Sequence, residues 1–115
     1  MAWRPLAASG VSSTSVTTPS GFVTHGDFMI IAELRARLTV VDAEDNLVGY
    51  LGKNGTVCDV DGWPNNKNKK GDIFRTAFIE RGKFNSPHGL AVDSEGNLYV
   101  AEWLIGGRFI KLAKS

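Results

Sequence analysis

The stretch from Phe84 to Trp103 is the sequence feature that most constrains the fold of this chain. It reads FNSPHGLAVDSEGNLYVAEW, with two short apolar runs on either side of an Asp-Ser-Glu-Gly-Asn turn. Apolar, β-branched and aromatic runs that flank a turn of this kind are typical of a β-hairpin. A weaker copy of the pattern lies between Pro19 and Leu34. The chain therefore contains an internal repeat, which indicates an architecture of stacked units.

The two copies align position by position. Pro19-Ser20-Gly21 matches Pro87-His88-Gly89, and Phe22-Val23-Thr24 matches Leu90-Ala91-Val92. Further along, Gly26-Asp27 matches Gly96-Asn97, Ala32-Glu33 matches Ala101-Glu102, and Arg37 matches Arg108. The period is about 70 residues, longer than the roughly 40–50 of propeller repeats. We assign the surplus to the polar stretch between Leu51 and Lys83.

The better copy closely resembles an NHL repeat, the blade unit of one class of β-propeller. The resemblance is carried by the Pro-His-Gly start, the Asp-x-x-Gly-Asn turn and the acid that ends the second strand. It implies an all-β fold with about two antiparallel four-stranded blades of an incomplete NHL-type β-propeller and a long loop insertion between them. The expected strands are 22–24, 28–34, 37–42 and 47–52 in the first blade, and 89–93, 98–103 and 108–112 in the second.

These boundaries divide the chain into four segments. Residues 1–18 are expected to be a disordered or extended lead-in, 19–53 the first blade, 54–83 the insertion, and 84–115 an incomplete second blade. The β-branched residues of Val11–Thr18 would also suit a strand that closes the last blade. Within the insertion, Ile73–Glu80 is compatible with a strand, although a short helix is also open.

The number of repeats conflicts with a closed propeller, which needs at least about four blades. We therefore expect a fragment, a C-terminal piece, or a unit that self-associates through exposed blade edges and faces.

Composition narrows the partners and the compartment. The net charge of +1 leaves no electrostatic footprint for nucleic acid, and no apolar run is long enough to span a membrane. The single cysteine, Cys58, excludes an internal disulfide, and the N-terminus does not resemble a secretory signal. The expected partner is therefore a small molecule or a protein, and a cytoplasmic location is slightly favoured.

His88 is the best single candidate for a functional residue. It starts a blade, and the innermost strand of a propeller blade lines the central channel, so His88 should lie at the channel mouth. In the amidating-lyase relatives that the resemblance brings in, Pro-His at blade starts supplies zinc ligands. The resemblance thus implies zinc, or calcium, at His88 in a full-length parent. A zinc site normally needs three protein ligands, so a histidine bonded to backbone or solvent is the alternative.

His25 aligns with Asp93, at the far end of the inner strand, and is not expected to share a metal with His88.

A glutamate and an arginine recur in both copies, as Glu33 with Arg37 and Glu102 with Arg108. An ion pair across each hairpin is the natural interpretation, and we assign Glu33 and Arg37 to it. The alternative is an arginine that faces an anionic ligand, because the planar guanidinium suits carboxylates. Glu102 and Arg108 are therefore also candidates for the channel mouth, together with His88.

Three functions remain open at this point. The first is a scaffold that binds a ligand or protein, and the second is part of a metal-dependent propeller lyase or hydrolase, similar to peptidyl-hydroxyglycine amidating lyases. The third is an RNA-binding surface that uses the lysines of residues 67–70. The segment 59–62 reads as a turn rather than a calcium loop. Trp63 and Trp103 are expected to be packing residues. The sequence contains no complete catalytic constellation and does not decide whether the chain is an enzyme.

Overall fold

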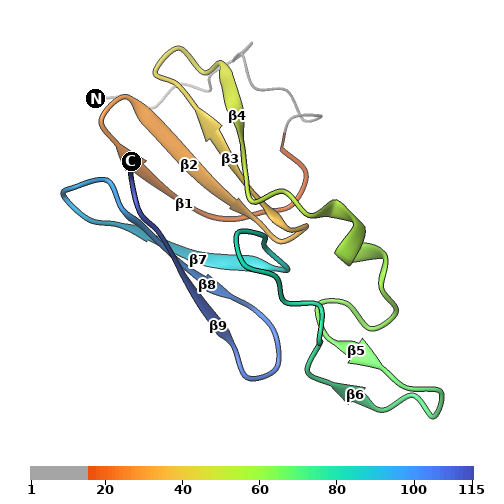
Figure 1. Ribbon diagram of the computed structural model, residues 1–115. Helices are drawn as coiled ribbons and strands as arrows, with labels where there is room; N and C mark the ends of the chain where they lie inside the picture. The colour runs from red at the N-terminus through yellow and green to blue at the C-terminus, as the bar shows by residue number, and fades with distance from the viewer. Residues whose placement is uncertain (1–15) are drawn as a thin grey trace, which may run out of the picture.

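The computed structural model describes residues 16–115, which form an all-β fold (Figure 1). A four-stranded sheet contains β1 (Pro19–His25), β2 (Phe28–Glu33), β3 (Arg37–Val41) and β4 (Leu47–Leu51) in chain order. A three-stranded sheet contains β7 (Pro87–Val92), β8 (Leu98–Glu102) and β9 (Arg108–Leu112), also in chain order. All neighbouring strands are antiparallel. This arrangement confirms the predicted fold class and is the one expected of two partial propeller blades.

All seven predicted blade strands are present, but both inner strands start earlier than predicted. β1 begins at Pro19 and β7 begins at Pro87, and each proline pairs with the glutamate that ends the next strand. The register then shifts by one residue, which leaves Ser20 and His88 bulged out of the pairing. A bulge lets the chain continue as a strand past the proline, which has no amide hydrogen to donate.

Two turns of the same design connect strands in the two sheets. After β3, the side chain of Asp42 accepts hydrogen bonds from the backbone N–H groups of Glu44 and Asn46 at 3.0 and 2.9 Å. After β7, Asp93 accepts the equivalent bonds from Glu95 and Asn97 at 3.0 and 2.9 Å. The residue before each asparagine has a positive φ, 64° at Asp45 and 88° at Gly96. The turn chemistry therefore explains why the chain reverses at both places.

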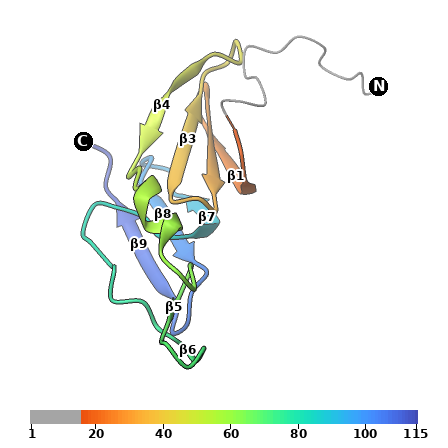
Figure 2. The ribbon, with the colours of Figure 1, turned by 90° about the vertical axis from the view of Figure 1, so that its right-hand side faces the viewer.

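The two sheets approach each other most closely at β1 and β7 (Figures 1 and 2). The Ser20 hydroxyl lies 3.0 Å from the carbonyl oxygen of Pro87, and the His25 ring lies beside Gly96, just beyond β7. The strands therefore run side by side in the same direction. Between the sheets, apolar side chains form the core, with its buried members Ile30, Ala32, Ala36, Leu38, Val57, Cys58, Phe84, Leu98 and Val100.

The insertion is more structured than predicted. It contains a short 3-10 helix, η1 (Gly55–Asp59), and a small hairpin of β5 (Asn66–Lys67) and β6 (Ile73–Phe74), which projects beyond both sheets in Figure 1. The prediction for Ile73–Glu80 is wrong beyond its first two residues, which alone are extended, and no helix forms there. The hairpin forms because the Asn68 side chain accepts bonds from the N–H groups of Lys70 and Asp72.

Residues 16–18, the described residues before β1, do not pair with β9. Leu34 N–H donates to the carbonyl oxygen of Thr18, and Thr17 and Thr18 bond to Glu33, so these residues lie against the four-stranded sheet. For Thr17 and Thr18, the alternative of a strand that closes the last blade is therefore wrong. The rest of that alternative, up to residue 15, and most of the predicted lead-in lie outside the described residues.

No helix within residues 16–115 is both long and apolar enough to cross a membrane.

Candidate functional site

Glu33 holds together the start of β1 and the start of β3. One carboxylate oxygen accepts hydrogen bonds from the N–H groups of Thr17 and Thr18 at 2.6 and 3.2 Å. The other accepts from Arg37 Nε at 2.6 Å and from the Thr39 hydroxyl. Burial of this carboxylate opposes ionisation, but the bonds from Arg37, Thr39, Thr17 and Thr18 lower the pKa of Glu33 to about 2. The carboxylate is therefore charged and saturated in the folded chain.

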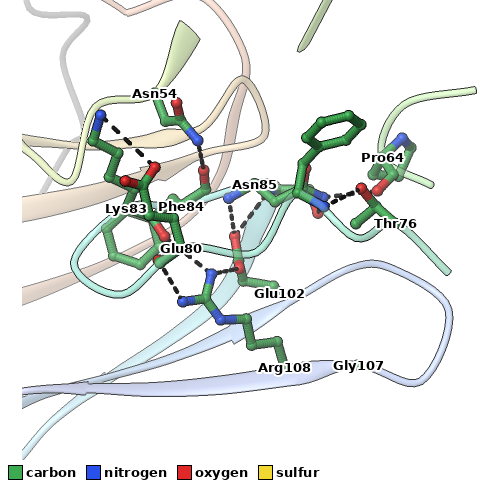
Figure 3. Close-up of polar contacts among 12 residues, drawn as sticks. Asn54, Pro64, Thr76, Glu80, Lys83, Phe84, Asn85, Glu102, Gly107 and Arg108 are labelled. Carbon is green, nitrogen blue, oxygen red and sulfur yellow. Dashed lines mark hydrogen bonds and ion pairs between the residues drawn. The ribbon is translucent and has the colours of Figure 1, made fainter. Parts of the chain in front are cut away.

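Glu102 likewise accepts from two backbone N–H groups and an arginine in the three-stranded sheet (Figure 3). One oxygen accepts from the N–H groups of Asn85 and Ser86 at 2.5 and 2.7 Å, and the other lies 3.0 Å from Arg108 Nη1. Arg108 also donates to the carbonyl oxygens of Lys83 and Glu80 at 3.0 and 2.8 Å. Its guanidinium therefore joins the insertion to the end of β8.

The recurring glutamate thus clamps the two residues that precede each Pro-x-Gly. Thr17-Thr18 in the first copy and Asn85-Ser86 in the second donate to it with consecutive N–H groups. The Glu33 and Glu102 side chains are both fully buried, and Arg37 and Arg108 are mostly buried against them. These groups already have their partners within the chain, and their contacts are those of a structural element.

His88 has a different environment. It is the bulged residue of β7, it is exposed, and it lies between the buried Pro87 and the partly buried Gly89. Its ring centroid lies 6.3 Å from that of Trp103, at an interplanar angle of 53°. A bulge turns a side chain away from the regular alternation of a strand and is frequent near functional sites. Of the three residues predicted at the channel mouth, His88 is therefore the one on the surface.

Trp103 is 61% exposed, so its prediction as a packing residue is wrong. It follows β8 directly, and two hydrogen bonds fix its backbone to Ser86. The Trp103 N–H donates to the Ser86 carbonyl oxygen, and the Ser86 hydroxyl donates to the Trp103 carbonyl oxygen. The side chain is left on the surface because the next residue, Leu104, is the one that is buried. Trp63, by contrast, packs against the core and donates from Nε1 to the carbonyl oxygen of Asn85 at 2.9 Å.

The insertion supports this end of the three-stranded sheet. Asn65 accepts from Ile105 N–H at 2.7 Å, and Arg75 donates to the carbonyl oxygens of Ile105 and Gly107 at 3.2 and 3.1 Å. The Asn85 side chain donates to the carbonyl oxygen of Pro64 at 2.8 Å. These contacts fix the loop after Trp103 and the residues before His88. The insertion is therefore part of the platform that presents the two aromatic rings.

The other residues that the sequence brought forward lie elsewhere. His25 ends β1 and lies beside Gly96, whereas His88 is the second residue of β7, so the two histidines belong to opposite ends of these parallel neighbours. Among residues 16–115, no three His, Cys, Asp or Glu side chains lie close enough to hold a metal ion. Cys58 is buried, and burial raises the pKa of its thiol, which disfavours the reactive thiolate.

The comparisons with known proteins agree with the hairpin geometry. Residues 84–103 match the NHL repeat family, and this stretch covers β7, the turn and β8. No curated protein and no solved structure matches the chain. The hairpin that carries His88 and ends at Trp103 is therefore an NHL repeat, as the sequence predicted.

Sequence reasoning located His88 but missed its setting. The bulge had one signal, because a proline followed by glycine two residues later occurs in both copies at the place where the register shifts. The exposure of Trp103 had no such signal, because an aromatic residue after an apolar strand is equally compatible with burial.

Proposed function

We propose that this chain is an NHL-type β-propeller unit that serves as a binding scaffold for a small molecule or a protein, with His88 and Trp103 as the contact residues. The observation that carries the proposal is the bulge, which leaves an imidazole exposed beside an exposed indole. A neutral imidazole can donate and accept hydrogen bonds, and an indole offers a large apolar face and one donor. Together they suit a partner that is flat or apolar and has at least one polar group.

The contacts of Glu102 support this proposal. Glu102 and Arg108 fix Asn85 and Ser86, the residues directly before Pro87, and thereby position His88. A fixed site loses less conformational freedom when a partner binds. In the proposed scaffold, Glu102 and Arg108 are therefore positioning residues behind the contact surface.

The metal-dependent alternative finds no complete donor set in the described part of this chain. Zinc needs three protein ligands, and His88 has no group of His, Cys, Asp or Glu around it that would supply them. We derive no metal-dependent reaction step from these residues.

The test is a nuclear magnetic resonance screen of the whole chain against a library of small aromatic and carboxylate compounds. Signal changes should map to residues 86–88 and 103–105. His88→Ala should weaken the best compound about tenfold, since the loss of one hydrogen bond costs about 1 kcal/mol or more. His25→Ala is the matched control and should leave the affinity unchanged, because His25 lies at the far end of β1.

Three outcomes would contradict this proposal. Equal losses from the two histidine variants would show that the binding surface is elsewhere. Stoichiometric zinc binding that disappears in His88→Ala would favour the metal-dependent alternative. Salt-dependent binding of a single-stranded RNA, with signal changes on Lys69 and Lys70 of the β5–β6 hairpin, would favour the RNA-binding alternative.

A further inference from the structure

The two sheets expose opposite faces that the internal repeat makes complementary. In the three-stranded sheet, Leu90 and Val92 on β7 and Val100 on β8 point toward the four-stranded sheet and pack on its core residues. Their equivalents in the first copy are Phe22, Thr24 and Ile31. These lie on one face of the four-stranded sheet, because Phe22 pairs with Ile31 and Thr24 is two residues from Phe22 on β1. We call the surface of Phe22, Thr24, Met29 and Ile31 face A.

Face A points away from the three-stranded sheet. Phe22 is 65% exposed, and Met29 is also exposed. The residues of the same strands that alternate with them, Val23, Ile30 and Ala32, belong to the core or pack against it. Since side chains alternate between the two faces of a strand, face A is the outer face of the first copy.

In the three-stranded sheet, the opposite side of the repeat is the exposed one. Its outer face carries Gly89, Ala91, Tyr99, Ala101 and Phe109, which we call face B and which line a shallow hollow of about 470 Å³. Phe109 is 89% exposed. The first-copy equivalents of face B, which include Val23, Ile30, Ala32 and Leu38, are the residues that pack toward the three-stranded sheet.

The contact inside the chain therefore joins two sides that correspond to faces B and A. The four-stranded sheet contributes its side equivalent to face B, and the three-stranded sheet contributes its side equivalent to face A. Face A of the four-stranded sheet and face B of the three-stranded sheet remain exposed. We propose that these faces bind each other between two copies of this chain, head to tail, so that the contact inside the chain is repeated between chains. This inference does not depend on the ligand-binding role of His88.

Symmetry limits the size of the assembly. A head-to-tail contact is heterologous, so it either closes into a ring or continues as a filament. Propellers have about four to eight blades, so with two sheets per copy a closed ring holds roughly two to four copies. The wild-type chain should therefore have a mass of two to four copies by sedimentation or light scattering at micromolar concentration.

Two variants test the direction of the contact. Phe22→Ser spoils face A and keeps face B, whereas Phe109→Ser does the opposite. Each variant alone lacks one of the two required faces and should be monomeric. An equimolar mixture should form a complex of one copy of each, because Phe109 of the first variant can still meet Phe22 of the second. Recovery in the mixture also shows that both variants are folded.

Ile73→Ser is the control, because Ile73 is a half-exposed apolar residue on the β5–β6 hairpin, away from both faces. It should assemble like the wild type. A monomeric wild-type chain would overturn the proposal and would fit a face A covered by residues outside the described range. Loss of assembly in only one of the two phenylalanine variants, or a mixture that stays monomeric, would exclude the head-to-tail contact.

Discussion

At the scale of single residues, the recurring glutamate holds the start of each copy in place. Each carboxylate accepts two consecutive backbone N–H groups and an arginine, and so replaces the pairing that the following proline cannot make. Residues next to it, such as Ser20 and His88, are held in place without being used in the clamp. Residues with a structural role and residues open to a partner therefore lie within a few positions of each other.

The low pKa of Glu33 predicts how its clamp responds to acid. A carboxyl with a folded pKa of about 2 and an ordinary value of 4.5 stabilises the fold above pH 4.5, and this contribution is lost as the pH falls toward 2. Glu33→Gln should lower the free energy of unfolding by roughly 3 kcal/mol at neutral pH and flatten its slope in that acid range. Urea titrations across this range measure both effects.

Glu44→Gln is the matched control for this prediction, because Glu44 is exposed in the turn after β3. It should leave both the stability and its acid slope unchanged. Asp93, whose pKa is also about 2 because the Asn97 side chain donates to it, contributes to the slope equally in the wild type and in the variant. An unchanged slope in Glu33→Gln would therefore contradict the role of the clamp.

At the scale of elements, β8 is the central strand of the three-stranded sheet. Val100 is 1% exposed and pairs with Leu90 on one side and Ile110 on the other. Val100→Asp should destabilise the chain by several kcal/mol, because an unpaired carboxylate would be buried between the sheets. Lys69→Asp, on the exposed hairpin, should change stability by no more than about half a kcal/mol. Similar unfolding midpoints for the two variants would refute the assignment of β8.

At the scale of the whole molecule, the close approach of β1 to β7 sets how the two sheets pack. A Cβ atom at Gly21 would lie 3.0 Å from the carbonyl oxygen of His88, a contact with backbone that cannot rotate away. Gly21→Ala should therefore cost about 1–2 kcal/mol by separating the sheets. Thermal and urea unfolding give the value, and the His88 ring signals should shift as well.

Gly49→Ala provides the comparison for Gly21→Ala. Gly49 lies in β4, and a Cβ atom there would meet nothing within 4 Å. This substitution should be neutral or slightly stabilising, because glycine loses more conformational freedom on folding than alanine. Equal losses at the two positions would mean that β1 and β7 do not approach as closely as described.

The sequence by itself determined the parts of this protein that depend on near neighbours. Alternation of apolar residues predicted the strands, and Asp-x-x-Gly-Asn predicted the turn after β7, because turn and pairing preferences act over a few residues. The recurrence of glutamate and arginine in both copies indicated an ion pair, and Pro87-His88-Gly89 indicated where a functional residue would lie.

Tertiary structure alone decided how these parts are presented. The bulge at His88 depends on how β7 pairs with β8, the exposure of Trp103 depends on the burial of Leu104, and the docking of the insertion depends on Trp63, Asn65 and Arg75. The close approach of β1 to β7, across about 70 residues of chain, likewise fixes which face of each sheet is covered. These features depend on contacts between segments that are far apart in the sequence, and local sequence preferences do not determine such contacts.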